Sequence, residues 1–323
     1  MVLKRVQLRP VLTILARFGL ALYAIILVFI CVSHASLADP NWPFGLFASF
    51  TRTVLAVLPI SFVLAFAVWR RLAWILPVLG ALVSYPVLTY DDFAIPSHEA
   101  CGAECITVVM SNLRHRTEAV VSLGQQLEGD FNVLILTEVP NVVEADFLAD
   151  AFNGRVDYLA PPDHRVGSRL AVISRDISRQ IDTTTLSIQQ SNLTTRDIVI
   201  VSGTGFGNLS VIGVHPIWPK TAPRMRARDV YLKTAGTIAE TGGEFILIGD
   251  YNLTPWEPVF RTLPGSRAGD PRFLRTWNAN DPTQNLVIDH ARISSGLRLI
   301  ESSVLDDIES DHYPIRIRVI AKE

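Results

Sequence analysis

The pattern of hydrophobic and polar positions divides the chain near residue 95. Before this point long apolar runs dominate, and three of them lie at residues 11–32, 53–69 and 72–90. Each approaches the roughly 17 to 25 residues that a helix needs to cross a bilayer. Beyond it, short apolar runs alternate with polar turns, which is typical of a globular domain. The pattern therefore predicts a membrane anchor at residues 1–95 and a folded domain at residues 96–323.

The folded domain is predicted to have a mixed α+β fold. Strands are expected at residues 105–111, 132–137, 169–174, 183–188, 197–202, 209–214, 244–248, 285–293, 298–304 and 313–320, and helices at residues 117–127, 142–152 and 224–239. Many strands with few helices favour sheets that pack face to face, with the helices outside.

Positive charges predict how the anchor is oriented. Lys4, Arg5 and Arg9 precede the first apolar run, and Arg70 and Arg71 separate the second from the third, whereas residues 33–49 of the link between the first two contain no Lys or Arg. The positive-inside rule then places the N-terminus in the cytoplasm. Three crossings deliver the folded domain to the extracytoplasmic side. A signal peptide explains the first run alone, but not three in succession.

Composition sharpens this division. Hydrophobic residues make up 49% of the chain and the mean hydropathy is +0.30, and most of this excess lies before residue 91. Residues 1–90 hold seven of the 29 basic and one of the 31 acidic residues, so the remainder carries a net charge near −8. Proteins that bind a phosphate backbone non-specifically are usually basic. The acidic domain disfavours a general nucleic-acid binder, although a metal site also requires acids.

The cysteines agree with an extracytoplasmic domain. Cys31 ends the first apolar run, whereas Cys101 and Cys105 lie four positions apart in C-G-A-E-C. An oxidising compartment permits a disulfide there. A metal site is less favoured, because no second cysteine or histidine pair accompanies this one. Spacing alone leaves the disulfide open.

One stretch in the middle of the domain combines a strand with functional side chains. Residues 246–255 read I-L-I-G-D-Y-N-L-T-P, a buried-strand pattern that ends at Gly249 and then presents Asp250 and Asn252. Strands position side chains more accurately than loops do. The same residues are also ordinary turn formers. Taken alone, the stretch favours a turn.

Five other groups of acids, amides or histidines lie next to expected apolar strand runs. Asn112, Glu138, His215 and the pair Asp289–His290 follow such runs, and the pair Asp311–His312 precedes the last strand. Each is common in loops by itself. Six such ends in one domain favour a shared functional site.

In this order the motifs resemble those of the endonuclease/exonuclease/phosphatase superfamily of metal-dependent phosphoesterases. They are S-N-L-R around Asn112, L-T-E at Glu138, R-L-A-V-I-S-R from Arg169, G-V-H-P at His215, G-D-Y-N at Asp250, I-D-H at Asp289 and S-D-H-Y-P-I at Asp311. The resemblance covers residues 106–319 and implies a four-layer α/β/β/α sandwich. The chain is similar to a membrane-anchored bacterial branch that includes relatives of the teicoplanin-resistance protein, which implies a bacterial cell membrane.

The resemblance also implies roles for the residues at the strand ends. Glu138 would bind Mg²⁺ or Mn²⁺, which prefer oxygen ligands, and Asn112 and Asp311 would complete or support the metal site. His312 would be a general base or a phosphate contact. Asp289 would orient its ring, as the acid of a catalytic triad does.

Three further residues would handle water and phosphate. Asp250 would position or deprotonate the attacking water, Asn252 would donate to a phosphoryl oxygen, and His215 would contact the phosphate or the leaving group. Members of the family often have glutamine where Thr137 precedes Glu138, a departure that removes no ligand.

Other charged residues nearby also fit roles outside catalysis. His290 fits a structural histidine as well as a functional one. Arg224 and Arg228, on the expected helix at residues 224–239, are interpreted as solvated or phosphate-steering rather than catalytic.

The substrate has alternatives too. Membrane tethering and the acidic domain favour a lipid-linked or other membrane-proximal phosphate. An extracytoplasmic nuclease acting on DNA or RNA is the alternative within enzymes. A non-catalytic module that binds a cell-envelope partner is the alternative outside them.

Overall fold

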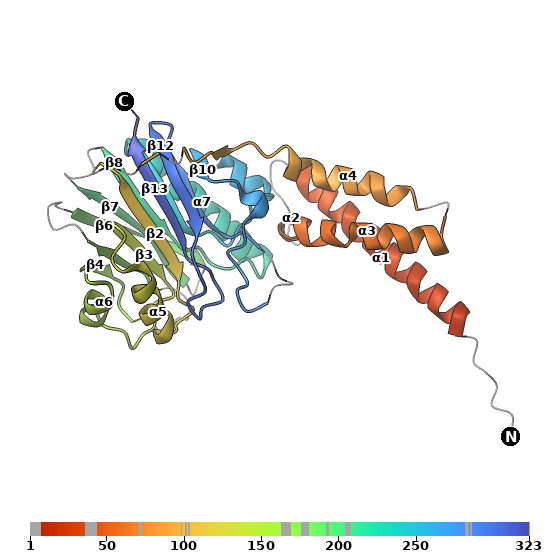
Figure 1. Cartoon of the computed structure of the whole chain (residues 1–323), viewed down its shortest axis with the longest axis horizontal. Helices are drawn as coiled ribbons and strands as arrows, with labels where there is room; N and C mark the ends of the chain where they lie inside the picture. Colours follow the sequence, from red (N-terminus) through yellow and green to blue (C-terminus); the bar gives the residue numbers. More distant parts are fainter. Residues whose placement is uncertain are drawn as a thin grey trace, which may run out of the picture. The chain divides into compact units, whose positions relative to one another are not determined.

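The computed structural model divides into two compact units, which we describe separately (Figure 1). The first comprises Met1–Tyr90 with Trp256–Pro258, and the second Asp91–Pro255 with Val259–Glu323. The structure describes residues 8–35, 44–70, 73–97, 99–100, 102, 104–162, 169–175, 181–191, 194–203, 208–281, 284 and 286–322.

The first unit is helical. Its helices are α1 (Leu8–Ala35), α2 (Phe44–Ser49), α3 (Thr51–Val68) and α4 (Ile75–Leu88). Leu27, Ile30 and Val83 are buried within it, whereas many other apolar side chains, such as Phe18 and Ile60, are exposed. Outward-facing apolar side chains are expected where lipid covers a helix.

Two of these helices are long and apolar enough to cross a membrane. They contain the segments Pro10–Ser33 and Thr51–Val68. The third predicted run, residues 72–90, forms the 14-residue helix α4. That length is less than the roughly 17 residues of a usual span, so the third crossing stays a prediction.

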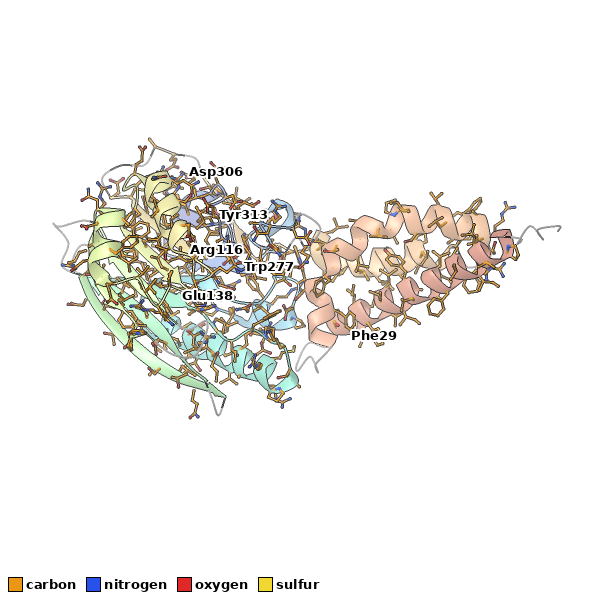
Figure 2. All side chains as sticks on the ribbon, turned by 90° about the horizontal axis from the view of Figure 1, so that it is seen from below. Phe29, Arg116, Glu138, Trp277, Asp306 and Tyr313 are labelled. Carbon is orange, nitrogen blue, oxygen red and sulfur yellow. The ribbon has the colours of Figure 1, made fainter. Side chains whose placement is uncertain are left out.

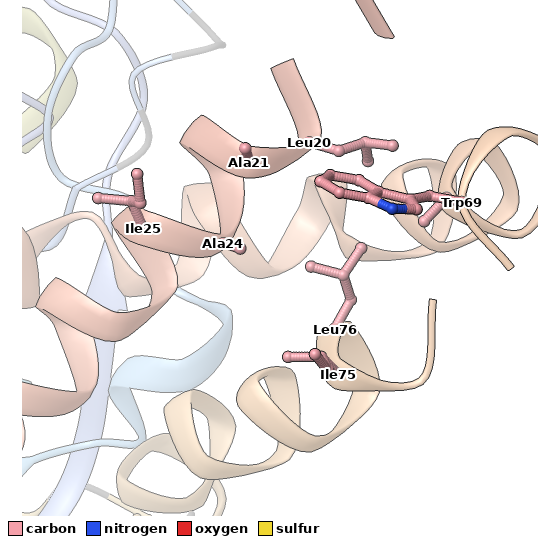
Figure 3. Close-up of a pocket in the computed structure, with 8 residues that line it drawn as sticks. Leu20, Ala21, Ala24, Ile25, Trp69, Ile75 and Leu76 are labelled. Atoms are coloured by element: carbon pink, nitrogen blue, oxygen red, sulfur yellow. The ribbon is translucent and has the colours of Figure 1, made fainter. Parts of the chain in front are cut away.

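A hollow in the first unit is lined by apolar and aromatic side chains (Figure 3). Leu20, Ala24, Ala65, Trp69 and Leu76 are among them. None of the described residues that line it is charged, so these residues offer nothing to hold a phosphate group.

The second unit contains two β-sheets. The seven-stranded sheet has the order β1 (Phe93–Ala94), β10 (Ser266–Ala268), β11 (Asp289–Ile293), β9 (Glu244–Asp250), β8 (Leu209–Val214), β7 (Thr194–Gly203) and β6 (Ile181–Ser191). The six-stranded sheet has the order β12 (Leu297–Val304), β13 (Ile315–Ala321), β2 (Ile106–Asn112), β3 (Val133–Thr137), β5 (Ala171–Ser174) and β4 (Arg155–Leu159).

Alternating side chains along the strands build two separate cores. Val108 and Met110 of β2 enter a core that also takes Ile246 and Ile248 of β9, so this core lies between the sheets. Val109, between them in sequence, joins a second core with α5 and α6. Successive side chains of a strand point to opposite faces, so β2 is buried on both sides.

Helices flank both sheets (Figure 1). Helices α5 (Thr117–Leu127) and α6 (Ala145–Phe152) pack on the six-stranded sheet. Helix α7 (Ala222–Thr241) contacts β6, β8 and β9 of the other sheet. Two short 3₁₀ helices, at Pro258–Thr262 and Pro271–Phe273, complete the described regular elements. Two sheets flanked by helices confirm the predicted α+β class.

The strand predictions differ from the structure in a few places. Strands β1, β4 and β10 were not predicted. Strands β1 and β10 have only two and three residues, and the side chains of β4 are half-buried or exposed. Strand β11 begins at Asp289, not at residue 285, which lies outside the described residues. Cys105 is disulfide-bonded, whereas Cys101 lies outside the described residues.

Candidate active site

Parallel strand pairs bring the predicted residues to one edge of each sheet. Strands β8 and β9 are parallel, with Val214 opposite Gly249. The next residue of each segment, His215 and Asp250, therefore lies at the same edge of the sheet. Strands β2 and β3 are parallel with Asn112 opposite Thr137, which places Asn112 beside Glu138. The carboxyl ends of neighbouring parallel strands lie at the same edge, and ligand sites often form there.

Strand β9 approaches β8 closely just before Asp250. A Cβ atom at Gly249 would lie 1.9 Å from the Val214 carbonyl oxygen, so only glycine fits. Antiparallel pairing with β11 then places Asp250 opposite Asp289. Asn112, from the other sheet, donates its Nδ2 to Asp250 Oδ2 at 3.1 Å. The two sheets therefore meet at Asp250.

Asp289 and His312 form a tight pair beside Asp250. The His312 Nδ1 atom lies 3.0 Å and 3.1 Å from the two carboxylate oxygens of Asp289. The other ring nitrogen, Nε2, lies 3.9 Å from Asp250 Oδ2. All three side chains are buried. We call Asp250, Asp289 and His312 the acid–histidine corner.

Charges within the acid–histidine corner shift each other's titration. Burial raises the pKa of Asp250 to about 7, although the nearby His312 opposes the shift. For His312, burial disfavours the charged ring, but Asp289 and Asp250 outweigh it and raise the pKa to about 10. At neutral pH His312 is therefore a cation held between two carboxyl groups.

Asp250 also forms the turn that its sequence suggests. Its Oδ1 accepts from the Asn252 backbone N–H at 2.9 Å, and Asn252 has a positive φ of 49°. Its Oδ2 faces Asn112, His215 and His312 instead. One carboxylate oxygen thus serves the turn and the other faces the site, so the two interpretations of this stretch are compatible.

The turn after Asp250 is held by buried groups. Arg228 donates from Nη1 to the Asn252 carbonyl oxygen at 2.7 Å and is fully buried. Of the two interpretations of Arg228, the solvated one is therefore wrong, because the side chain is buried against the turn, and the phosphate-steering one stays a prediction. Asn252 donates its Nδ2 to the Pro216 carbonyl oxygen at 3.2 Å, which fixes the direction of its amide.

Glu138 forms a second, looser group with two histidines. Its Oε1 lies 3.6 Å from His215 Nε2, and its Oε2 lies 3.5 Å from His115 Nε2. His215 Nε2 is also 3.6 Å from Asp250 Oδ2, so it links this group to the first. Figure 2 labels Glu138 among the side chains of the second unit. We call Glu138, His115 and His215 the glutamate corner.

The two histidines of the glutamate corner were unequally predictable. His215 follows β8 directly and was predicted, and its burial and the nearby Arg196 hold its pKa well below the usual range, so it is neutral. His115 was missed, because it lies inside a loop three residues after Asn112 rather than at a strand end. The sequence signal that could have identified His115 is its position directly after the S-N-L-R motif.

Asp311 lies at the border of the acid–histidine corner. Its Oδ2 accepts from Trp277 Nε1 at 3.2 Å and lies 3.5 Å from Arg114 Nε. Its Oδ1 is 4.0 Å from His312 Nε2. Arg114 and Trp277 already engage one oxygen, so its predicted part in metal binding stays a prediction.

His290 has a structural environment. Arg267 Nε donates to His290 Nδ1 at 3.0 Å, so the ring proton is on Nε2, which donates to the Leu253 carbonyl oxygen at 2.8 Å. Burial and Arg267 lower the pKa of His290 well below its usual value. A neutral, fully hydrogen-bonded imidazole packed on Tyr251 and Phe260 supports the loop after Asp250.

The arrangement suits a divalent metal ion. Ligand atoms of Asp250, Asp289 and His312 lie within 4.8 Å of one another. His115 Nε2 is buried and has no hydrogen-bond partner among the described residues. Carboxylate oxygens are the ligands that Mg²⁺ and Mn²⁺ prefer. The orphaned His115 nitrogen lies beside the Glu138 carboxylate and is a further donor in the glutamate corner. The residues therefore fit a metal.

Comparisons with known proteins agree with this geometry. The sequence model of the Endonuclease/Exonuclease/phosphatase family matches residues 110–312. A search among curated proteins returned no match. Several solved structures share the fold at low sequence identity.

Three of these structures are similar over about two thirds of this chain. A functionally unknown conserved protein from Enterococcus faecalis V583 has 16% identity and a TM-score of 0.53, with 67% of this chain and 100% of that one covered. An endonuclease/exonuclease/phosphatase from Beutenbergia cavernae DSM 12333 has 14% identity and a TM-score of 0.53, with 68% and 72% covered. TDP2 of D. rerio, complexed with a single-strand DNA product, has 14% identity and a TM-score of 0.51, with 67% and 98% covered.

Proposed function

Because the chain belongs to the endonuclease/exonuclease/phosphatase family of metal-dependent phosphoesterases, we propose that it hydrolyses a phosphate ester or anhydride by attack of an activated water at the membrane surface. The observation that carries this proposal is the acid–histidine corner. A carboxyl group with a pKa of about 7 lies beside a histidine that a second carboxylate holds at both oxygens. Acid–base catalysis near neutral pH requires such a pair of groups, whose pKa values are shifted from their usual ranges.

We assign the base to Asp250. A base is most effective when its pKa lies near the working pH, which favours Asp250 over His312. His312, a cation at neutral pH, contacts the phosphoryl group and stabilises the charge that develops there. Asp289 orients the His312 ring through Nδ1. Of the two roles predicted for His312, the phosphate contact is therefore favoured.

Neighbouring groups complete the assignment. His215 is neutral and contacts the phosphate or the leaving group through Nε2. Asn252 has a second amide hydrogen for a phosphoryl oxygen, since only one is used by Pro216. Glu138, with Asn112 and Asp311, would hold Mg²⁺ or Mn²⁺. A bound divalent cation supplies charge neutralisation on the phosphoryl oxygens.

We place the enzyme in a bacterial cell membrane, with its N-terminus in the cytoplasm and its catalytic domain outside. Two apolar helices and the positive charges that flank them support this placement. A membrane-proximal phosphate, such as a lipid-linked phosphate or pyrophosphate, is the favoured substrate, because a tethered enzyme meets such substrates at high local concentration.

A nuclease is the second candidate. Its support is the similarity in fold to the D. rerio TDP2 structure with single-strand DNA product, at 14% identity. The acidic domain opposes it, since binding to a nucleic-acid backbone is driven by positive charge. A silent binding module is disfavoured, because the site residues are present and their charges are coupled.

The test uses the full-length protein in lipid nanodiscs. Isoprenoid-lipid pyrophosphate, a chromogenic phosphodiester and single-stranded DNA are offered separately, with Mg²⁺ or Mn²⁺ and with chelator. Metal-dependent release of phosphate from the lipid, absent in His312→Ala, is expected. Rapid cleavage of DNA with the lipid untouched would favour the nuclease. Unchanged hydrolysis in chelator would refute the metal-dependent reaction.

A further inference from the structure

We propose that His115 is a metal ligand that acts together with Glu138, and that this pair makes the site select a first-row transition-metal ion over Mg²⁺. The proposal rests on the metal-dependent function proposed above and adds a ligand and a metal preference to it.

The backbone holds the two residues together. The His115 backbone N–H donates to the Glu138 carbonyl oxygen at 2.8 Å, and the Leu113 N–H donates to the Thr137 carbonyl oxygen at 2.9 Å. His115 and Glu138 have positive φ angles of 57° and 51°. Such conformations are uncommon outside glycine, and they cluster at functional sites. Two neighbouring loops therefore present this imidazole and this carboxylate to one another.

The side chains approach without bonding. His115 Nε2 lies 3.5 Å from Glu138 Oε2, and this nitrogen is buried without a hydrogen-bond partner among the described residues. A charge-assisted hydrogen bond is shorter, about 2.7 to 2.9 Å. Two atoms that bind one metal at about 2.1 Å each lie roughly 3 to 3.5 Å apart. The observed separation is that of two ligands of one ion.

The surroundings leave Glu138 available. Its other oxygen faces the neutral His215 at 3.6 Å. The neighbouring cation, Arg114, pairs with Asp311 instead. The side chains of Glu138 and His115 are 24% and 31% exposed, so the pair lies at the border of the site, whereas the His115 Nε2 atom itself is covered. A carboxylate between two imidazoles lacks the fixed positive partner that would compete with a metal.

An imidazole ligand changes the preferred metal. Mg²⁺ is bound through oxygen atoms and water, whereas imidazole suits Zn²⁺ and other first-row transition metals, whose affinities follow the Irving–Williams order. A site with one nitrogen and one carboxylate therefore favours Mn²⁺ modestly and Zn²⁺ strongly.

Calorimetry on the full-length protein tests the preference. Mg²⁺, Mn²⁺ and Zn²⁺ are titrated separately into wild type, His115→Ala and His115→Asp. His115→Ala is expected to weaken Mn²⁺ and Zn²⁺ binding by about tenfold or more, as loss of a metal-site histidine or its partner typically does, with less effect on Mg²⁺. His115→Asp supplies an oxygen instead, so Mg²⁺ binding is expected to persist while the preference for Zn²⁺ falls. Glu118→Ala is the control, because it removes an exposed acid three positions away.

Pulsed EPR of the Mn²⁺-loaded protein identifies the ligand directly, since it detects the nitrogen of a bound imidazole. The signal is expected to disappear in His115→Ala and to persist in Glu118→Ala. If it persists in His115→Ala and disappears in His215→Ala, His215 is the ligand and the proposal is wrong. Unchanged Mn²⁺ and Zn²⁺ affinities in His115→Ala would also overturn it. If wild type binds none of the metals, the proposed function fails as well, so the two failures are distinguishable.

Discussion

The acid–histidine corner and the glutamate corner lie at the same edge of the sheets but are built differently. In the first, His312 is within 3.1 Å of both Asp289 oxygens and all three side chains are buried. In the second, the nearest separations are 3.5 Å and 3.6 Å and two of the side chains are partly exposed. The first has its histidine paired with Asp289, although its ligand atoms also lie close enough together to share a cation, whereas the second leaves the His115 nitrogen without a hydrogen-bond partner among the described residues. This difference supports the proposed division of roles, in which the acid–histidine corner holds charge and the glutamate corner binds an exchangeable ion.

Breaking the acid–histidine corner is expected to have the largest effect. His312→Gln removes the cation beside the phosphate, and activity should fall by about 10² to 10⁴-fold, the usual size of acid–base and electrostatic terms. Asp289→Asn should lose nearly as much, because residues that act as a unit are not additive. Steady-state kinetics on the substrate that the screen identifies measure both. Equal activity in His312→Gln and in the control Glu118→Gln would contradict the assignment.

A substitution in the glutamate corner should reduce activity less, and excess metal should reverse the loss. Glu138→Gln weakens metal binding, so activity at low metal concentration is expected to fall by about 10²-fold. Raising Mn²⁺ should restore much of it, because the remaining ligands still bind at high concentration. His312→Gln should not be restored in this way. Metal titrations of both variants separate the corners, and failure of excess metal to restore Glu138→Gln would argue against its role as a ligand.

The sequence predicted the strand ends better than their partners. Asp250, Asp289 and His312 follow or precede apolar runs, so their convergence follows from parallel and antiparallel pairing. No local sequence pattern predicts that one oxygen of Asp250 serves the turn while the other faces the site. The direction of the second oxygen depends on Asn112 and His312, which come from distant segments. Likewise, the engagement of Asp311 by Trp277 arises only in the folded chain.

Loops and short elements were the least predictable parts. His115 lies in a loop with a positive φ, where no periodicity marks its direction. Helix α4 was predicted over residues 72–90, but the structure has Ile75–Leu88, because apolar sequence alone does not mark where a helix ends. Arg228 was interpreted as solvated or phosphate-steering, yet it is buried and donates to the Asn252 carbonyl oxygen.

The pH dependence of activity distinguishes the two corners by a smaller effect than these substitutions do. Asp250 must be ionised to act as a base, and burial raises its pKa to about 7. At saturating metal, kcat/KM should rise by about tenfold per pH unit on the acid side and level off above the apparent pKa of the site. In the metal-free protein, Glu138→Gln should lower the pKa of Asp250, because Glu138 contributes to raising it. An unchanged Asp250 pKa, measured by NMR in chelator, would show that the two corners titrate independently.

The smallest expected effect is on stability, and it has the opposite sign to the effect on activity. The pKa of Asp250 rises from 3.8 in the unfolded chain to about 7 in the fold, so the unfolded state binds fewer protons between these values and stability falls as pH rises through this window. Above about pH 7 the buried carboxylate is a net cost, even with His312 beside it.

Asp250→Asn keeps the shape without the charge. It should therefore abolish activity yet raise the melting midpoint of the metal-free protein at pH 8, by about 2 to 4 °C for each kcal/mol regained. At pH 4 the gain should nearly vanish, because Asp250 is then protonated in the fold. Thermal unfolding in chelator at both pH values measures this, with Asp130→Asn, an exposed acid paired with Arg316 and Arg318, as the control for loss of a surface carboxylate. A lower midpoint for Asp250→Asn at pH 8 would mean that the acid–histidine corner stabilises the fold through its charges instead of holding them at a cost for catalysis.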